Sequence, residues 1–168
     1  MSYLEPVTMF AATLTTCEPA VLPAGPTQAK IHALEDALRD LPQTPMEPEH
    51  YFAEGMYGRE LFIPAGQIVV GKTHRHEHLV QLLSGEATIA TDKGVERVRG
   101  PKTWVSPAGV KRALVTHTDC LFFTFHLNES NTRDLAAIED YVIDPYPALA
   151  QDAPELAELS DALQGVYA

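Results

Sequence analysis

The sequence predicts an all-β core, an antiparallel barrel or jelly roll, with helices on either side of it. Between residues 50 and 127, short runs rich in Val, Ile, Leu, Phe and Thr alternate with breaks rich in Gly, Pro, Asp and Ser, a pattern typical of many short strands. The flanking segments carry apolar residues at helical spacing instead. With 168 residues, 45% of them hydrophobic, the chain is long enough for one compact domain with a sizeable core.

The N-terminal region, residues 1–48, is expected to be a proline-rich arm that contains one helix. The helix is predicted over Thr27–Leu41, where apolar residues fall at helical spacing, at Ile31, Leu34, Leu38 and Leu41. Thr27 is a suitable N-cap, and Pro42 ends the helix because proline disfavours helical backbone at the residue before it. The flanking proline-rich pieces are expected to lie as extended arms on the domain or on a partner subunit.

The central region, residues 49–127, is expected to form the barrel. Turn residues separate its strand-forming runs. The predicted strands are Glu60–Ile63, Gln67–His74, His78–Leu83, Glu86–Thr91, Val95–Arg99, Thr103–Ser106, Arg112–Thr116 and Cys120–Leu127. The break Asp92-Lys93-Gly94 predicts a hairpin turn with glycine in the left-handed position.

The C-terminal region, residues 128–168, is expected to be an acidic helical tail. Helices are predicted over Asn131–Val142 and Pro154–Leu163, because each segment has apolar residues along one face. The many Asp and Glu residues of this tail indicate a solvated helical face.

Charge and composition limit the classes of partner. A net charge of −11 argues against a nucleic acid or an anionic membrane, because both are themselves negatively charged. No apolar stretch reaches 18 residues, so no transmembrane helix is expected, and Met1–Phe10 lacks the basic start of a signal peptide. Cys17 and Cys120 form no CxxC pair, so two free thiols are expected, with a disulfide left open. We expect a cytoplasmic protein with a small-molecule ligand.

The segment Gly71–Leu79 concentrates more potential chemistry than any other part of the sequence. Lys72, His74, His76 and His78 occupy alternate positions in it. On an extended strand, alternate residues point to the same face, so three imidazoles and an ammonium group would converge there. Imidazole is the commonest protein ligand of transition metals, and the segment therefore predicts a metal site.

The spacing around this segment resembles the cupin family. The first cupin motif is a glycine, five residues, His-x-His, three or four residues, a glutamate, six residues and a second glycine. Here Gly66 and Gly85 enclose the motif with the same spacing. His74 keeps the second histidine, while Lys72 stands at the first histidine and His78 stands at the glutamate.

The second cupin motif is a glycine, about five residues, Pro-x-Gly, two residues, a histidine, three residues and an asparagine. Gly100 and Pro107-Ala108-Gly109 keep this pattern, with Arg112 at the histidine and Thr116 at the asparagine. The resemblance covers about residues 55–127 and extends to small uncharacterised cupins of bacteria and phages. It implies a single cupin-type antiparallel jelly-roll barrel, whereas the usual metal site carries over only in part.

A metal site at His74 and His78 needs a third ligand. We rank His126 first, because it lies on the same face as Phe122 and Thr124 in a last strand that can return beside the motif-bearing strand of a jelly roll.

His76 ranks second, because strict alternation aims it inward but a turn, usual in cupins at this point, would aim it at solvent. His117 ranks third, because it falls in a predicted turn. Three neutral imidazoles with open coordination positions suit Fe(II), Zn(II), Ni(II), Cu(II) or Mn(II) alike. The alternative for His74 and His78 is a hydrogen-bonded polar core without a metal.

Cationic residues at two ligand positions predict an anionic substrate. Lys72 and Arg112 would place positive charge beside the metal, which favours a group such as a carboxylate. The alternative for Arg112 is an ion pair with a core acid such as Glu60. Tyr57, together with Arg59, precedes the first predicted core strand and is expected to line the barrel mouth as part of the substrate-binding set.

The sequence thus predicts a metal-binding cupin that acts on a small anionic organic molecule, with oxygenase, lyase and isomerase chemistry all open. The alternative is a non-catalytic structural or ligand-binding cupin in which the histidines form a polar core. Cupins commonly dimerise through their sheets, so a homodimer is expected in either case.

Overall fold

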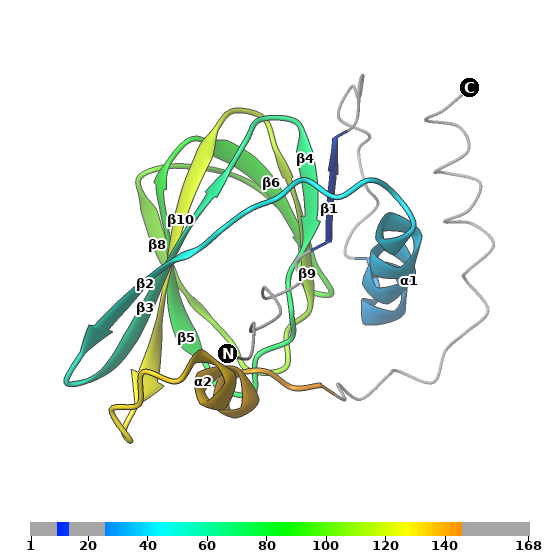
Figure 1. Cartoon of the computed structure of the whole chain (residues 1–168). Coiled ribbons are helices and arrows are strands. Elements are labelled where there is room, and N and C mark those ends of the chain that lie inside the picture. Colours follow the sequence, from blue (N-terminus) through cyan, green and yellow to red (C-terminus); the bar gives the residue numbers. More distant parts are fainter. Residues whose placement is uncertain (1–9, 14–25, 146–168) are drawn as a thin grey trace, which may run out of the picture.

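The structure, a computed structural model, describes residues 10–13, by their backbone alone, and residues 26–145. Two five-stranded antiparallel sheets face each other and form a barrel (Figure 1). Sheet I has the order β1-β4-β9-β6-β7, with strands at Phe10–Thr13, Gln67–Val70, Arg112–Thr116, Glu86–Thr91 and Gly94–Arg99. Sheet II has the order β2-β3-β10-β5-β8, with strands at Glu49–Ala53, Gly55–Ile63, Cys120–Asn128, His78–Ser84 and Lys102–Ser106.

The chain changes sheet at most connections from β4 onwards, as it does in a jelly roll. Alternate side chains of each strand therefore face the partner sheet across the barrel. The predicted all-β jelly-roll barrel is confirmed.

The barrel interior is apolar at one end and polar at the other. Leu61, Val69 and Leu82 belong to one buried cluster that draws on both sheets. Strand β10 passes through both environments, because Phe122 lies in that cluster and His126 lies near the other end of the strand. The apolar end provides the core that fixes the strands, and the polar end carries the candidate site.

Helix α1, Gln28–Arg39, packs on the outer face of sheet I (Figure 1). Its Ile31 and Leu38 are each 2% exposed and belong to one buried cluster with Ile68 and Val70 of β4. The predicted N-cap is confirmed, because the Thr27 hydroxyl accepts a hydrogen bond from the backbone of the third residue after it. The helix ends at Arg39, before the predicted Leu41.

Helix α2, Leu135–Val142, lies across the polar end of the barrel. Its Ile138 and Val142 pack against Tyr57 of β3. The predicted helix was four residues too long at its start, because the Asp134 side chain caps the helix at Ala136 and Asn131 has a positive φ of 53°, outside the helical region. The predicted helix Pro154–Leu163 and Cys17 lie outside the described residues.

The strand predictions need four corrections. The predicted strand Glu60–Ile63 is β3, which begins five residues earlier, at Gly55. Strand β2 was not predicted, and β1 lies inside the predicted proline-rich arm, where it pairs with β4. The predicted strand Gln67–His74 ends at Val70, since the chain then leaves the sheet and His74 forms only an isolated bridge with Ile143. None of the helices within residues 26–145 is long and apolar enough to cross a membrane.

Candidate metal centre

Three histidines from different parts of the chain meet at the polar end of the barrel. His74 lies in the connection after β4, His78 begins β5, and His126 is near the end of β10. Each offers one ring nitrogen, and these three atoms lie within 4.8 Å of one another. The ring centroids are 4.1 Å apart for His74 and His78, 4.7 Å for His78 and His126, and 5.2 Å for His74 and His126. Such a set can hold one metal ion.

Strand alternation explains two of the three positions. In β5, His78 faces inward with Val80 and Leu82, which are buried in the barrel. In β10, His126 shares its face with Phe122 and Thr124, both of which line the interior cavity. His126, the first-ranked candidate for the third ligand, is therefore the residue that the fold brings to His74 and His78.

His74 is held by backbone contacts on both sides rather than by a strand. It forms an antiparallel bridge with Ile143, and the Gly109 amide donates to its carbonyl oxygen at 2.8 Å. The neighbouring Arg75 amide donates to the Val142 carbonyl at 2.8 Å. The segment after α2 and the Pro-x-Gly loop together fix this ring in the cluster.

Burial keeps all three imidazoles neutral. It is the largest cause of the lowered pKa of each ring, which falls to about 2 for His74, about 3 for His126 and about 4 for His78. Mutual repulsion among the rings adds to the effect for His74 and His126, and Arg112 lowers the pKa of His74 and His78 further. A neutral imidazole has one nitrogen with a free lone pair, which is the form that binds a metal.

Two ring nitrogens of the cluster have no partner among the described residues. They are His74 Nδ1 and His78 Nε2, both buried. His78 Nδ1 lies 3.3 Å from the His76 carbonyl oxygen, which only accepts hydrogen bonds, so the proton sits on Nδ1 and the lone pair on Nε2. Buried polar atoms are rarely left unpaired, and a metal ion would satisfy both nitrogens. The residues present therefore fit a metal.

A cavity of about 90 Å³ adjoins the cluster. Its walls are mostly apolar, and it is also lined by His74, His78, Arg59, Arg112 and Lys72. Burial lowers the pKa of both arginines, but from a value so high that they remain charged. The cavity therefore combines neutral imidazoles with fixed positive charge.

The predicted substrate-binding residues lie in three different environments. Arg112 lines the cavity and donates a hydrogen bond to the Ser106 hydroxyl, and it does not form the alternative ion pair with Glu60. Lys72 lines the cavity too, but its ammonium group pairs with Glu139 of α2. Sequence reasoning missed Glu139, because nothing in the sequence places α2 over the barrel.

Tyr57 lies behind the cluster rather than at an opening. It is 6% exposed, its hydroxyl is hydrogen-bonded to His50 Nδ1 at 2.7 Å, and its ring centroid is 5.9 Å from that of His126. It is absent from the residues that line the cavity, whereas Arg59, two residues later on the same face of β3, lines it. Tyr57 supports His126, and its role in substrate binding stays a prediction.

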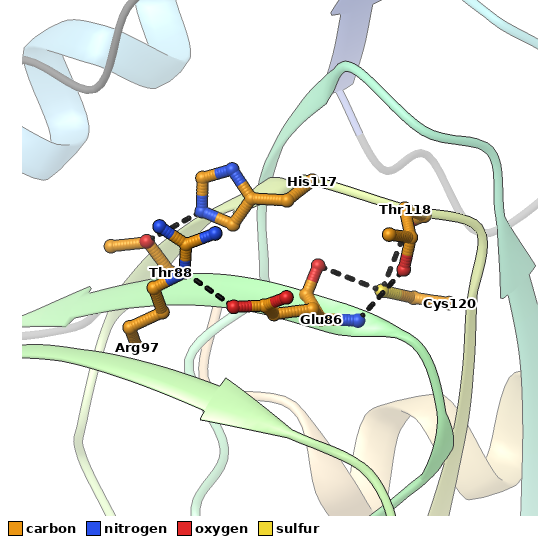
Figure 2. A network of polar contacts seen from close by, with 6 residues as sticks. All are labelled: Glu86, Thr88, Arg97, His117, Thr118 and Cys120. Carbon is orange, nitrogen blue, oxygen red and sulfur yellow. Dashed lines mark hydrogen bonds and ion pairs between the residues drawn. The ribbon is translucent and has the colours of Figure 1, made fainter.

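The two lower-ranked histidines lie away from the cluster. His76 is exposed, and its ring centroid is 4.7 Å from that of Tyr141. His117 Nε2 is 2.8 Å from the Thr88 hydroxyl, in a polar network that also contains Glu86 and Arg97 (Figure 2). Strict alternation therefore failed at His76, because this stretch is a turn and not a strand.

The sulfur of Cys120 belongs to the same network (Figure 2). The thiol is buried and donates to the carbonyl oxygens of Thr118 at 3.3 Å and Glu86 at 3.4 Å. Burial raises its pKa, which makes it a poor nucleophile.

The chain was compared with known proteins. No family model and no curated protein matches it. Among solved structures, a cupin-2 domain protein from Shewanella frigidimarina is 14% identical with a TM-score of 0.43, over 60% of this chain and 98% of that one. A Cupin 2 conserved barrel domain protein from Salinispora arenicola is 13% identical with a TM-score of 0.43, over 55% and 84%. A protein of unknown function from Streptococcus pyogenes is 22% identical with a TM-score of 0.42, over 52% and 77%.

The two sequence motifs coincide with the strands that build the site. The first motif spans β4 and β5, and the second spans β8 and β9. Gly66, Gly85 and Gly109 of these motifs all have positive φ, between 74° and 94°, which favours glycine. The two-sheet topology is that of a jelly-roll barrel, and the glycines of the two motifs lie at turns that border its strands, as the resemblance to cupins leads one to expect.

Proposed function

We propose that the protein binds one divalent transition metal through His74, His78 and His126 and acts on a small anionic organic molecule at that centre. The observation that carries the proposal is the convergence of three neutral imidazoles, two of them with unpartnered buried nitrogens, beside a cavity lined by two arginines. Three ligands leave coordination positions open, as catalytic sites do and closed structural sites do not.

The charge balance of the site favours an anion. All three ligands are neutral, so the full charge of a bound divalent ion would remain in a largely apolar cavity. Arg112 adds a further positive charge there, and its planar guanidinium group can bind a carboxylate through two parallel hydrogen bonds. A bound metal would supply Lewis acidity to such a substrate. Lys72 is held by Glu139, so Arg112 is the better candidate for orienting it.

The test is the metal content of protein purified without added metal, followed by titration with Fe(II), Ni(II), Zn(II), Mn(II) and Cu(II). We expect one equivalent of at least one of these metals to bind. Negligible bound metal, with no gain on adding any of the five, would contradict the proposal.

A double substitution separates this function from a polar core without metal. In the His74→Ala/His78→Ala variant we expect metal binding to be lost and the barrel to remain folded, as judged by circular dichroism. If the variant unfolds, the histidines serve as a structural polar core, and the non-catalytic alternative is favoured.

A further inference from the structure

A second cavity lies beside the histidine site, in the seam where the two sheets end. Strand β7 is the edge of sheet I and β8 is the edge of sheet II, and the two strands are not paired with each other. The cavity there has a volume of about 370 Å³, against about 90 Å³ for the one that adjoins the histidines. We call it the seam groove, and its walls include Val95, Val98 and Val110.

Three side chains separate the seam groove from the histidine cavity. Ile89, Trp104 and Arg112 line both spaces. They come from β6, β8 and β9, so they belong to both sheets. Arg112 is the charged member of this partition and reaches the Ser106 hydroxyl, next to the groove. A molecule bound in the groove would therefore contact the same guanidinium group that faces the histidines.

The barrel end beside His74 is covered by chain. Ile143 bridges His74 and lines the histidine cavity. On either side of it, the Asp144 amide donates to the Thr73 carbonyl at 2.9 Å, and the Arg75 guanidinium donates to the Ile143 carbonyl at 2.7 Å. A substrate too large for the cavity beside the histidines would therefore extend into the seam groove rather than toward this end of the barrel.

The chemistry of the groove suits an apolar body with an anionic end. Apart from Arg112, its charged residues are Lys93, Lys102 and Glu96, and the last two pair with each other across the seam. Valines and Trp104 supply apolar wall. We propose that the seam groove holds the organic body of an elongated carboxylate whose charged end lies on Arg112 and faces the histidine cluster. This inference rests on the proposed function for the identity of the reacting end.

Trp104 provides a direct probe, because it is the only tryptophan of the chain. We would titrate the full-length protein, loaded with Zn(II), with acetate, octanoate and 1-octanol and follow tryptophan fluorescence. Each methylene taken out of water strengthens binding by roughly fourfold. We therefore expect octanoate to bind at least about tenfold more tightly than acetate and, because of Arg112, more tightly than 1-octanol.

Two variants assign these preferences to the groove. Val95→Phe narrows the groove at an exposed position and should reduce the advantage of octanoate over acetate to below about threefold. Leu127→Phe, at an exposed position on the outer face of β10, is the matched control and should leave it unchanged. Arg112→Met should abolish the preference for octanoate over 1-octanol while keeping the binding of the apolar chain.

Equal affinities for acetate and octanoate in the wild type, or a fluorescence change insensitive to Val95→Phe, would overturn the inference. Repeating the titrations after metal removal separates it from the proposed function. The chain-length advantage depends on the groove and should survive in metal-free protein. A protein that never binds metal but keeps this advantage would refute the proposed function and support the inference about the seam groove. A protein that binds metal but lacks the advantage would support the proposed function and refute the inference.

Discussion

At the scale of single residues, the candidate site depends on three imidazoles that stay neutral. Burial does most of this, and the rings repel each other's protonated forms. Burial removes the water that would stabilise the protonated form of each ring, so the neutral form is favoured. The site is thereby ready for a metal without first releasing protons even below pH 6.5, where an ordinary histidine is mostly protonated.

We predict that metal-free protein loses stability as the pH falls below about 6.5. The folded pKa of each ring lies below the ordinary value of 6.5, so the unfolded chain binds more protons between those values, and stability is present above pH 6.5 and lost below it. At pH 5 each histidine contributes about 2 kcal/mol to this loss. Urea denaturation in EDTA from pH 8 to 5 measures it.

The control for this pH prediction is the His74→Gln/His78→Gln variant, which lacks two of the titrating rings. Its stability should change less over the same pH range. A variant whose stability falls as steeply as that of the wild type would show that other groups dominate the acid sensitivity.

Removal of one ligand should weaken metal binding far more than removal of a histidine elsewhere. For His126→Gln we expect the metal affinity to fall by more than about 100-fold, beyond the 10–100-fold typical of losing a supporting contact. His117→Gln is the matched control, because its ring pairs with Thr88 away from the cluster, and it should bind metal like the wild type. Competition with a chromogenic chelator measures both affinities. Equal affinities for the two variants would remove His126 from the ligand set.

The sequence predicted individual site residues where strand alternation applies. His126 follows from its parity with Phe122 and Thr124, and His78 from the motif spacing. The placement of His76 failed because alternation holds only within a strand. Glu139, the partner of Lys72, could not be predicted, since an ion pair between residues 67 positions apart depends on how α2 docks.

At the scale of elements, helix α1 is fixed to the barrel by a buried ion pair as well as by apolar contacts. Lys111, immediately before β9, pairs with Glu35 of α1 at 2.7 Å, and the two side chains are only 5% and 14% exposed. His32 Nδ1 lies 3.5 Å from the same carboxylate. Because Lys111 precedes Arg112, this contact also steadies the strand that carries a candidate substrate-binding residue.

Removal of one partner of the Lys111–Glu35 ion pair should lower the free energy of unfolding. Lys111→Met leaves the Glu35 carboxylate without its cation, and we expect a loss of about 3 kcal/mol in the free energy of unfolding. The double variant Glu35→Gln/Lys111→Met should recover part of that loss, because no unpaired charge remains. Arg39→Met is the control, since its pair with Asp36 is exposed and is worth about 0–1 kcal/mol. Equal losses in the single and double variants would contradict the prediction.

Helices and strands were predicted best where the residues that define them lie next to one another in the sequence. Strands β6 and β9 have the predicted bounds, because turn residues flank regular runs of strand formers. Strand β1 was hidden in a proline-rich region, and its pairing with β4 is a long-range contact. The start of α2 was predicted four residues too early, because the Asp134 side chain caps the helix and the positive φ of Asn131 lies outside the helical region.

At the scale of the whole molecule, sheet II presents an apolar outer face. Tyr51, Gly58, Phe125, Leu79 and Val105 stand in register across all five strands, from β2 to β8. Tyr51, Leu79 and Val105 are 48%, 45% and 56% exposed. Exposed apolar patches of this kind often mark interfaces, and a row that crosses the whole sheet can meet its own copy about a two-fold axis.

We predict that the expected homodimer forms through this face. Leu79→Lys/Val105→Lys places two charges in the row and should convert the dimer to a monomer with an unchanged circular dichroism spectrum. Val95→Lys, exposed on β7 of the other sheet, should leave the oligomeric state unchanged. Sedimentation equilibrium distinguishes these results. A wild type that is monomeric at all concentrations would contradict the prediction.

The proposed metal centre is tested most directly by crystallography of metal-soaked protein, with diffraction data collected on both sides of the absorption edge of the metal. We predict one anomalous peak at bonding distance, about 2.0–2.2 Å, from a ring nitrogen of each of His74, His78 and His126, with at least one coordination position not occupied by protein. A histidine cluster with no anomalous peak, or a peak held by other residues, would contradict it.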